Sequence, residues 1–128
     1  MRGIKGCAAP PPFTSWADPS ARDSNDKSRV ILWLGFLLPG DSSQREEWRW
    51  AQEIRDLKSI HVLLLGHHGS RTATSALLLS KLPGLRMAVA SARQRKYGHP
   101  HIEVEHRLRS RHIPLLRTEE WGHLHFEL

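Results

Sequence analysis

The sequence predicts an α/β domain in which helices flank a mixed β-sheet. Three observations lead to this prediction. Two aliphatic runs, at residues 62–65 and 86–91, have the continuous apolar character of strands buried under helices. A hairpin pattern at residues 29–38 precedes them, and an amphipathic helix pattern at residues 44–57 lies in between. Such alternation of helix and strand is typical of layered α/β architectures.

The predicted domain covers residues 27–128 and follows an irregular segment, residues 1–26. Pro10-Pro11-Pro12 cannot continue a helix or pair within a central strand, and Asp18-Pro19-Ser20 favours a turn. We therefore expect no regular element in this first segment.

The first helix and the hairpin have recognisable end signals. Gly35 is the turn residue between the strands at 29–34 and 36–38, which makes the hairpin tight. Ser42 or Ser43 can cap the helix at 44–57, because a serine hydroxyl accepts a hydrogen bond from the first turn.

Two more helices and a closing hairpin complete the prediction. Thr74 or Ser75 can cap a helix that runs to residue 82, and Pro100 suits the first position of another. Residues 113–116 and 122–128 are then expected to pair as two closing strands, with residues 119–122 as the turn. Apolar and polar side chains alternate in the last strand, as in a half-exposed edge.

Composition restricts the class of protein. The chain has 128 residues, enough for one compact domain, and no apolar run approaches the ~20 residues that a membrane span requires. We expect no export signal in the chain as given. Cys7 is the single cysteine, which excludes a disulfide framework and a cysteine-based zinc site. The net charge of +6 favours DNA, RNA or anionic lipid as partner, although an arginine-rich surface that binds nothing has the same composition.

The Gly-His-His-Gly sequence at residues 66–69 is the strongest functional signal. It follows the predicted strand at 62–65, so His67 and His68 emerge at the carboxyl end of a buried strand, where ligands of α/β sheets usually bind. A polar connecting loop is the alternative. Adjacent histidines between two glycines favour a metal or phosphate site.

Two other predicted strand ends bear polar groups that could converge with the histidine pair. Asp41 follows the hairpin, and Ser91, Tyr97 and His99 follow the strand at 86–91. Imidazole and carboxylate donors suit Zn²⁺ or Mn²⁺, and two such ions together can polarise a phosphoryl oxygen and supply hydroxide.

The motifs LLPGD, VLLLGHHGSRTATS, YGHPHIEV and LLRTEEWGHLHF occur in this order. Over about residues 28–128 the chain thereby resembles the second half of the C-terminal metallo-β-lactamase-like domain of the competence protein ComEC. The resemblance implies half of an αββα sandwich with a two-metal zinc or manganese site.

The resemblance also implies roles for individual residues. Asp41 matches a bridging metal carboxylate and His67 a metal histidine; with His68 they form the expected metal donors, and with His99 the expected catalytic set. The resemblance also places Ser70, Tyr97 and His101 in the same cleft. Together with Arg93, Arg95 and Lys96, which we expect beside the cleft from the basic balance of the sequence, they are the expected substrate-binding residues.

The resemblance implies nuclease-type hydrolysis of phosphodiesters during DNA uptake. Expected partners are DNA and the membrane channel portion of a longer parent protein, on the extracytoplasmic side of the bacterial inner membrane. The family's His-x-His-x-Asp-His motif is absent from the chain. We therefore expect a soluble fragment that binds metal weakly, is inactive alone, and self-associates through an apolar sheet face that the other half-domain would cover.

Two alternative functions remain open at this stage. The basic balance, with Arg93, Arg95 and Lys96 beside the expected cleft, fits a nucleic-acid-binding remnant without catalysis. The same metal donors would also fit a phosphoesterase of the cell envelope.

Overall fold

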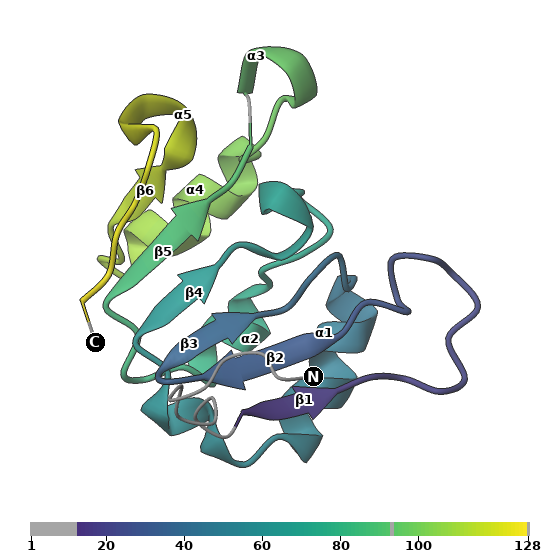
Figure 1. The fold of residues 1–128 in the computed structure, drawn as a ribbon. Coiled ribbons are helices and arrows are strands. Elements are labelled where there is room, and N and C mark those ends of the chain that lie inside the picture. The colour runs from purple at the N-terminus through teal and green to yellow at the C-terminus, as the bar shows by residue number, and fades with distance from the viewer. Residues whose placement is uncertain (1–12, 93, 128) are drawn as a thin grey trace, which may run out of the picture.

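The structure of the protein is a computed structural model that describes residues 13–92 and 94–127. For Gln94 and Arg95 it describes the backbone only. The predicted α/β class and mixed sheet are confirmed. Six strands form one sheet in the order β1-β2-β3-β4-β5-β6, so neighbours in sequence are neighbours in space (Figure 1).

The first three strands are antiparallel. The predicted hairpin is present as β2 (Val30–Trp33) and β3 (Phe36–Leu38), with Ile31 opposite Leu38. Leu34 and Gly35 join them with φ values of 48° and 83°, the left-handed pair that matches the twist of a two-residue hairpin.

The segment predicted to be irregular contains a strand, which corrects that prediction. β1 (Thr14–Trp16) pairs antiparallel with β2, placing Thr14 opposite Leu32. Three residues are too few to show a period, and backbone pairing with an existing edge stabilises them without one. The prediction for residues 1–12 lies outside the described residues.

The remaining strands are parallel to β3. β4 (Val62–Leu64) pairs with β3 and with β5 (Met87–Ala90), and β5 pairs with β6 (Leu115–Arg117). Parallel pairing brings the carboxyl ends of these four strands to one edge of the sheet, where the polar motifs follow them.

Helices connect the parallel strands. They are α1 (Gln44–Glu53), α2 (Ala76–Ser80) and α4 (Ile102–Ser110). Ser43 and Ser75 cap α1 and α2 by accepting from the N–H groups of Glu46 and Leu78, which confirms two predicted caps. α1 is shorter than predicted, because Ile54 has an extended ψ of 122° and the chain continues as a 3₁₀ turn, η1 (Asp56–Ser59).

The predicted closing hairpin is wrong. Residues 118–121 form a short helix, α5 (Thr118–Trp121), and no strand occurs among residues 122–127. Phe126 instead packs edge-on against Phe36 of β3, with ring centroids 5.0 Å apart. The alternating pattern reflects this one-sided packing, which needs no hydrogen-bonded ladder. Part of the predicted basic loop is likewise helical, as α3 (Gln94–Tyr97).

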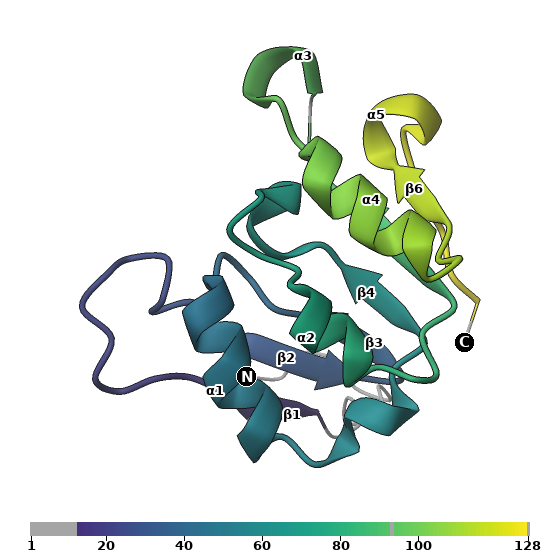
Figure 2. The ribbon, with the colours of Figure 1, turned by 180° about the vertical axis from the view of Figure 1, so that it is seen from behind.

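One face of the sheet, here called the helix face, bears the core. α1, α2 and α4 all lie over it (Figure 2). Its strand side chains are fully or almost fully buried and belong to one core cluster with Trp50 of α1: Val30, Leu32, Leu37, Leu63, Ala88 and Ala90.

Over the opposite face, here called the open face, lies no helix of residues 13–92 or 94–127 (Figure 1). In β2 to β5, Val89 is buried on this face, and the seven other strand side chains that alternate with the core residues are partly exposed: Ile31, Trp33, Phe36, Leu38, Val62, Leu64 and Met87. All seven are apolar, as expected for a sheet face that a partner would cover. Among the described residues, no helix combines the length and the apolar character that crossing a membrane requires.

Candidate functional site

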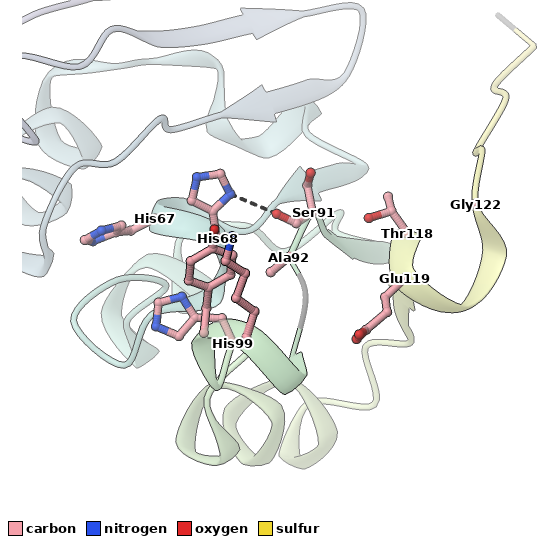
Figure 3. A pocket seen from close by; sticks show the side chains of 10 residues that line it. His67, His68, Ser91, Ala92, His99, Thr118, Glu119 and Gly122 are labelled. Atoms are coloured by element: carbon pink, nitrogen blue, oxygen red, sulfur yellow. Dashed lines mark hydrogen bonds between the residues drawn. The ribbon is translucent and has the colours of Figure 1, made fainter.

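The carboxyl edge of the sheet contains an open hollow of about 880 Å³, here called the histidine hollow. The segments after β4, β5 and β6 line it (Figure 3). Its lining residues are His67, His68, Ser91, Ala92, Lys96, Tyr97, His99, Thr118, Glu119 and Gly122.

The histidine pair has an unusual backbone. Both residues lie in the left-handed region, with φ of 47° for His67 and 56° for His68, inside the turn η2 (Gly66–Gly69). This conformation costs roughly 1–2 kcal/mol for each residue other than glycine. Backbone bonds offset that cost: the N–H of His67 donates to the Gly40 carbonyl (2.8 Å) and the N–H of His101 donates to the Gly69 carbonyl (2.8 Å). Strain of this kind is commonest where a side chain must be presented in a fixed direction.

Asp41 lies beside His68, and not in the hollow lining itself. Its Oδ1 is 3.9 Å from Nε2 of His68, with the two side chains 42% and 59% exposed. Nδ1 of His68 is 2.8 Å from the Ser91 carbonyl oxygen (Figure 3), which fixes the ring. Nε2, on the other side of the ring, is the nitrogen next to Asp41. Asp41 is itself fixed, because its N–H donates to Oγ of Ser28 (3.1 Å).

A buried carboxylate supports the loop that follows the histidines. Glu47 of α1 is fully buried; its Oε1 accepts from the N–H of Thr74 and its Oε2 from the N–H of Ser75 (2.9 Å). Burial raises the pKa of Glu47, and the two N–H donors and the Arg107 charge partly offset that rise. No sequence pattern distinguished Glu47 from an ordinary first-turn acidic residue.

The same loop is held from the opposite side by α4. Arg107 donates to the carbonyls of Ala73 and Thr74, each at 3.3 Å. Thr74 is fully buried with φ of 53°, and its Oγ1 has no hydrogen-bond partner among the described residues. The segment after the histidines is therefore clamped between α1 and α4.

His67 and His99 face each other, with ring centroids 6.3 Å apart and planes at 73°. Burial, and then the neighbouring charges of His67, His68 and His101, lower the pKa of His99. This lowered pKa favours the neutral ring of His99, in which one nitrogen can accept a hydrogen bond.

The basic side of the hollow is only partly described. Tyr97 is 58% exposed, and the Lys96 ammonium lies 5.1 Å from its ring centroid. Both residues line the hollow as predicted. Arg93 lies outside the described residues, as does the side chain of Arg95.

Ser70 and His101 have other roles in the structure than lining the hollow. Oγ of Ser70 is 3.0 Å from Oγ1 of Thr72, within the turn that follows the histidines. His101 caps α4, with its Nδ1 accepting from the N–H of Glu103 (3.2 Å).

Thr118 and Glu119 line the hollow, and the sequence reasoning missed them. They follow β6 at the same edge as the other polar residues. The signal was present, since a polar Thr-Glu-Glu follows an apolar run, but the incorrect closing hairpin placed Glu119 in a turn and left Thr118 without a role.

The donors at this edge fit a metal ion only in part. Asp41 and His68 form a donor pair whose outward nitrogen and oxygen suit zinc or manganese. Among the described residues, however, no group of three His, Cys, Asp or Glu side chains could hold an ion. The described residues therefore fit part of a metal site, with Asp41 next to His68, whereas His67 lies against His99.

Comparisons with known proteins identify relatives over most of the chain. Competence protein ComA of Neisseria gonorrhoeae is 33% identical over 110 residues, covering 83% of this chain, and ComE operon protein 3 of Bacillus subtilis is 28% identical over 115 residues, covering 84%. Recombination protein 2 of Haemophilus influenzae is 40% identical over 91 residues, covering 68%. The chain spans only 11–16% of the length of these curated relatives. No protein-family model matches the chain, and no solved structure matches it significantly.

Proposed function

The chain is related over most of its length to proteins of the ComEC family, and on this premise we propose that it is part of a metal-dependent hydrolase domain acting on DNA phosphodiesters during DNA uptake. The relatives' names refer to competence and recombination, in which DNA is handled. The observation that supports the proposal most directly is the pairing of Asp41 with His68 at the carboxyl edge of the sheet.

We further propose that the domain is half of a metallo-β-lactamase-like αββα sandwich. The mixed sheet with helices on one face and an apolar open face is the arrangement that half of such a sandwich would have. The other half would supply the remaining metal donors, in the His-x-His-x-Asp-His motif that this chain lacks.

The chain's own residues would prepare the site. Asp41 and His68 would hold one side of the metal, and the Ser91 carbonyl keeps the His68 ring in the tautomer that leaves Nε2 free to bind. A bound metal pair would polarise the phosphoryl oxygen and lower the pKa of bound water. His99, with its lowered pKa, would accept a proton at the rim of the hollow.

A zinc and manganese titration by calorimetry, combined with a plasmid-nicking assay, tests this proposal. We expect weak binding that Asp41→Ala and His68→Ala both reduce, and little or no nicking by the isolated chain. His112→Ala, at a histidine that lines a different surface hollow, serves as the control. Tight stoichiometric binding with nicking that Asp41→Ala abolishes would contradict the inactivity of the isolated chain. Binding that both site variants leave unchanged would contradict the site.

Nucleic-acid binding without catalysis is the second candidate function. The Lys96 ammonium and the exposed Tyr97 ring at the hollow support it, since exposed aromatic rings beside cations stack with bases of single strands. Binding whose affinity falls steeply with salt, without metal and without cleavage, would favour it. Assaying DNA and small phosphoesters side by side separates both functions from a phosphoesterase of the cell envelope.

We propose two partners in addition to DNA. The first is the membrane channel portion of a longer parent protein, beside which the domain would lie on the extracytoplasmic side. The second, for the isolated chain, is another copy of itself. Seven partly exposed apolar side chains of the open face would be covered in such a dimer.

A further inference from the structure

We propose a second nucleic-acid contact, separate from the histidine hollow: a cleft lined by Arg45, Arg71 and Arg107, in which the guanidinium groups of Arg45 and Arg71 hold the phosphate backbone of a strand. The proposal rests on the proposed function only in taking nucleic acid as the partner. The cleft, here called the arginine cleft, has a volume of about 460 Å³ and lies where α1, the loop after the histidines and α4 meet. Its other lining residues are Ser43, Gln44, Thr72 and Glu103.

The charges of the cleft are not balanced within the described residues. Glu103 is the one acidic lining residue, and it pairs with Arg107 at 3.4 Å. Arg45 and Arg71 are exposed, and neither forms an ion pair with any carboxylate in the described ranges. The lining therefore has two uncompensated guanidinium groups, and guanidinium is the group best shaped for bidentate phosphate binding.

The backbone holds these arginines in place. The N–H of Gln44 donates to the Thr72 carbonyl (2.7 Å), and Nε2 of Gln44 donates to the Arg71 carbonyl (3.0 Å). Arg107 is anchored by the carbonyls of Ala73 and Thr74 and by Glu103. Arg71 is thereby fixed beside the start of α1, where Arg45 lies, so little backbone ordering remains to be lost when a phosphate binds.

The arginine cleft and the histidine hollow share one loop. His67 and His68 line the hollow, and Arg71 and Thr72, a few residues further along, line the cleft. The Gly69 carbonyl in between accepts from the N–H of His101 just before α4, so the loop is fixed at its middle as well. A strand that passes along this loop would contact the cleft with one phosphate and the hollow with another. This arrangement would place a phosphodiester at the histidines without any contact to its base.

The test measures binding of a fluorescein-labelled single-stranded oligonucleotide to the full chain by fluorescence anisotropy, over a series of NaCl concentrations, with EDTA present. The double variant Arg45→Gln/Arg71→Gln is compared with Arg22→Gln/Arg55→Gln, which removes the same charge from exposed arginines outside the cleft. We expect the cleft variant to bind about tenfold more weakly at low salt, with the slope of log affinity against log salt reduced by about two. The control should lose much less than tenfold.

Equal losses in the two double variants would mean that net charge alone matters, and would overturn the proposal. Unchanged oligonucleotide binding in the cleft variant would also overturn the proposal, even if that variant no longer binds inorganic phosphate. The variant Arg45→Lys/Arg71→Lys keeps both charges and should keep most of the salt slope. Because EDTA removes metal from the assay, failure here leaves the Asp41 and His68 proposal untouched, and failure of the metal titration leaves the cleft untouched.

Discussion

The two faces of the sheet are built from the same strands but have different environments. On the helix face, Leu37 and Leu63 have no exposed surface and contact a core that includes Trp50. On the open face, their neighbours in the strands, Leu38 and Leu64, are partly exposed, and no helix in the described part of the chain lies above them (Figure 1). The residue types hardly differ between the faces. The difference lies in what covers them.

The comparison shows how stability and function are divided in this chain. The helix face contains the core and the carboxylate of Glu47 that anchors the histidine loop, so it determines whether the site is formed. The open face is an apolar surface available to a partner. Four predictions test this division.

The largest effect is expected from shortening a leucine on each face. Leu63→Ala removes a fully buried side chain and should lower the free energy of unfolding by about 2–5 kcal/mol. Leu64→Ala, one residue further along β4 on the open face, should cost roughly 1 kcal/mol or less. Urea denaturation followed by circular dichroism measures both. Similar losses for the two variants would show that the open face is covered in solution.

The next effect concerns the anchor beneath the histidine loop. Glu47→Ala leaves the N–H groups of Thr74 and Ser75 without their acceptor in a buried place, and should cost about 2–4 kcal/mol. Glu47→Gln should cost less, because its amide oxygen can still accept one of the two bonds. Urea denaturation gives the energies, and histidine NMR resonances report whether the loop has moved. Gln52→Ala, at an exposed position of the same helix, is the control.

A smaller effect on folding, but a clear one on association, is expected from polar residues on the open face. Leu38→Asn/Leu64→Asn should weaken self-association, because an amide buried at an interface loses its hydrogen bonds to water. Analytical ultracentrifugation over a range of concentrations measures the change. Leu77→Asn, at an exposed leucine of α2, should leave association unchanged. A wild-type chain that stays monomeric over the whole concentration range would contradict self-association through the open face.

The smallest effect belongs to the polar rim where the two faces meet. The pKa of His99 is lowered from 6.5 in the folded chain, so the unfolded chain takes up its proton first as pH falls. Stability should therefore decrease as pH drops through about 6.5 toward the lowered pKa, and the decrease should be smaller in His99→Gln. Urea midpoints measured at several pH values test this, with a His125→Gln variant as the comparison. An NMR titration of His99 above 6.5 would contradict it.

The sequence was sufficient for the elements whose signals are local. The hairpin around Gly35 and the caps at Ser43 and Ser75 depend on backbone conformation and one hydroxyl, and all three are present. β1 was missed because three residues show no period and their stability comes from pairing with β2. The closing strand was predicted wrongly. Alternating apolar and polar side chains show which side of a segment is apolar, but they do not show whether its backbone pairs with another strand.

In the candidate site, too, the sequence was sufficient only for residues whose place follows from local signals. Residues directly after a buried strand, such as Asp41 and His68, could be placed at one edge by counting strands. Roles set by contacts across the fold could not: Glu47 and Arg107 reach the histidine loop from two helices that precede and follow it in sequence. Ser70 and His101 were assigned to the hollow, and neither is in its lining. Adjacency in a motif does not fix the direction of a side chain.

The contact between Gly69 and Pro100 has a consequence for how this sequence can change. A methyl group on Gly69 would lie 2.7 Å from Cβ of Pro100, closer than two carbon atoms can approach, and Gly69 has φ of 89°. The Gly-His-His-Gly and Gly-His-Pro-His segments, about thirty residues apart in the chain, therefore form one structural unit. A side chain at position 69 would require a compensating change at position 100. The two positions should therefore covary in any lineage that keeps the fold. Grafting either segment alone into another scaffold would transfer its sequence but not its backbone conformation.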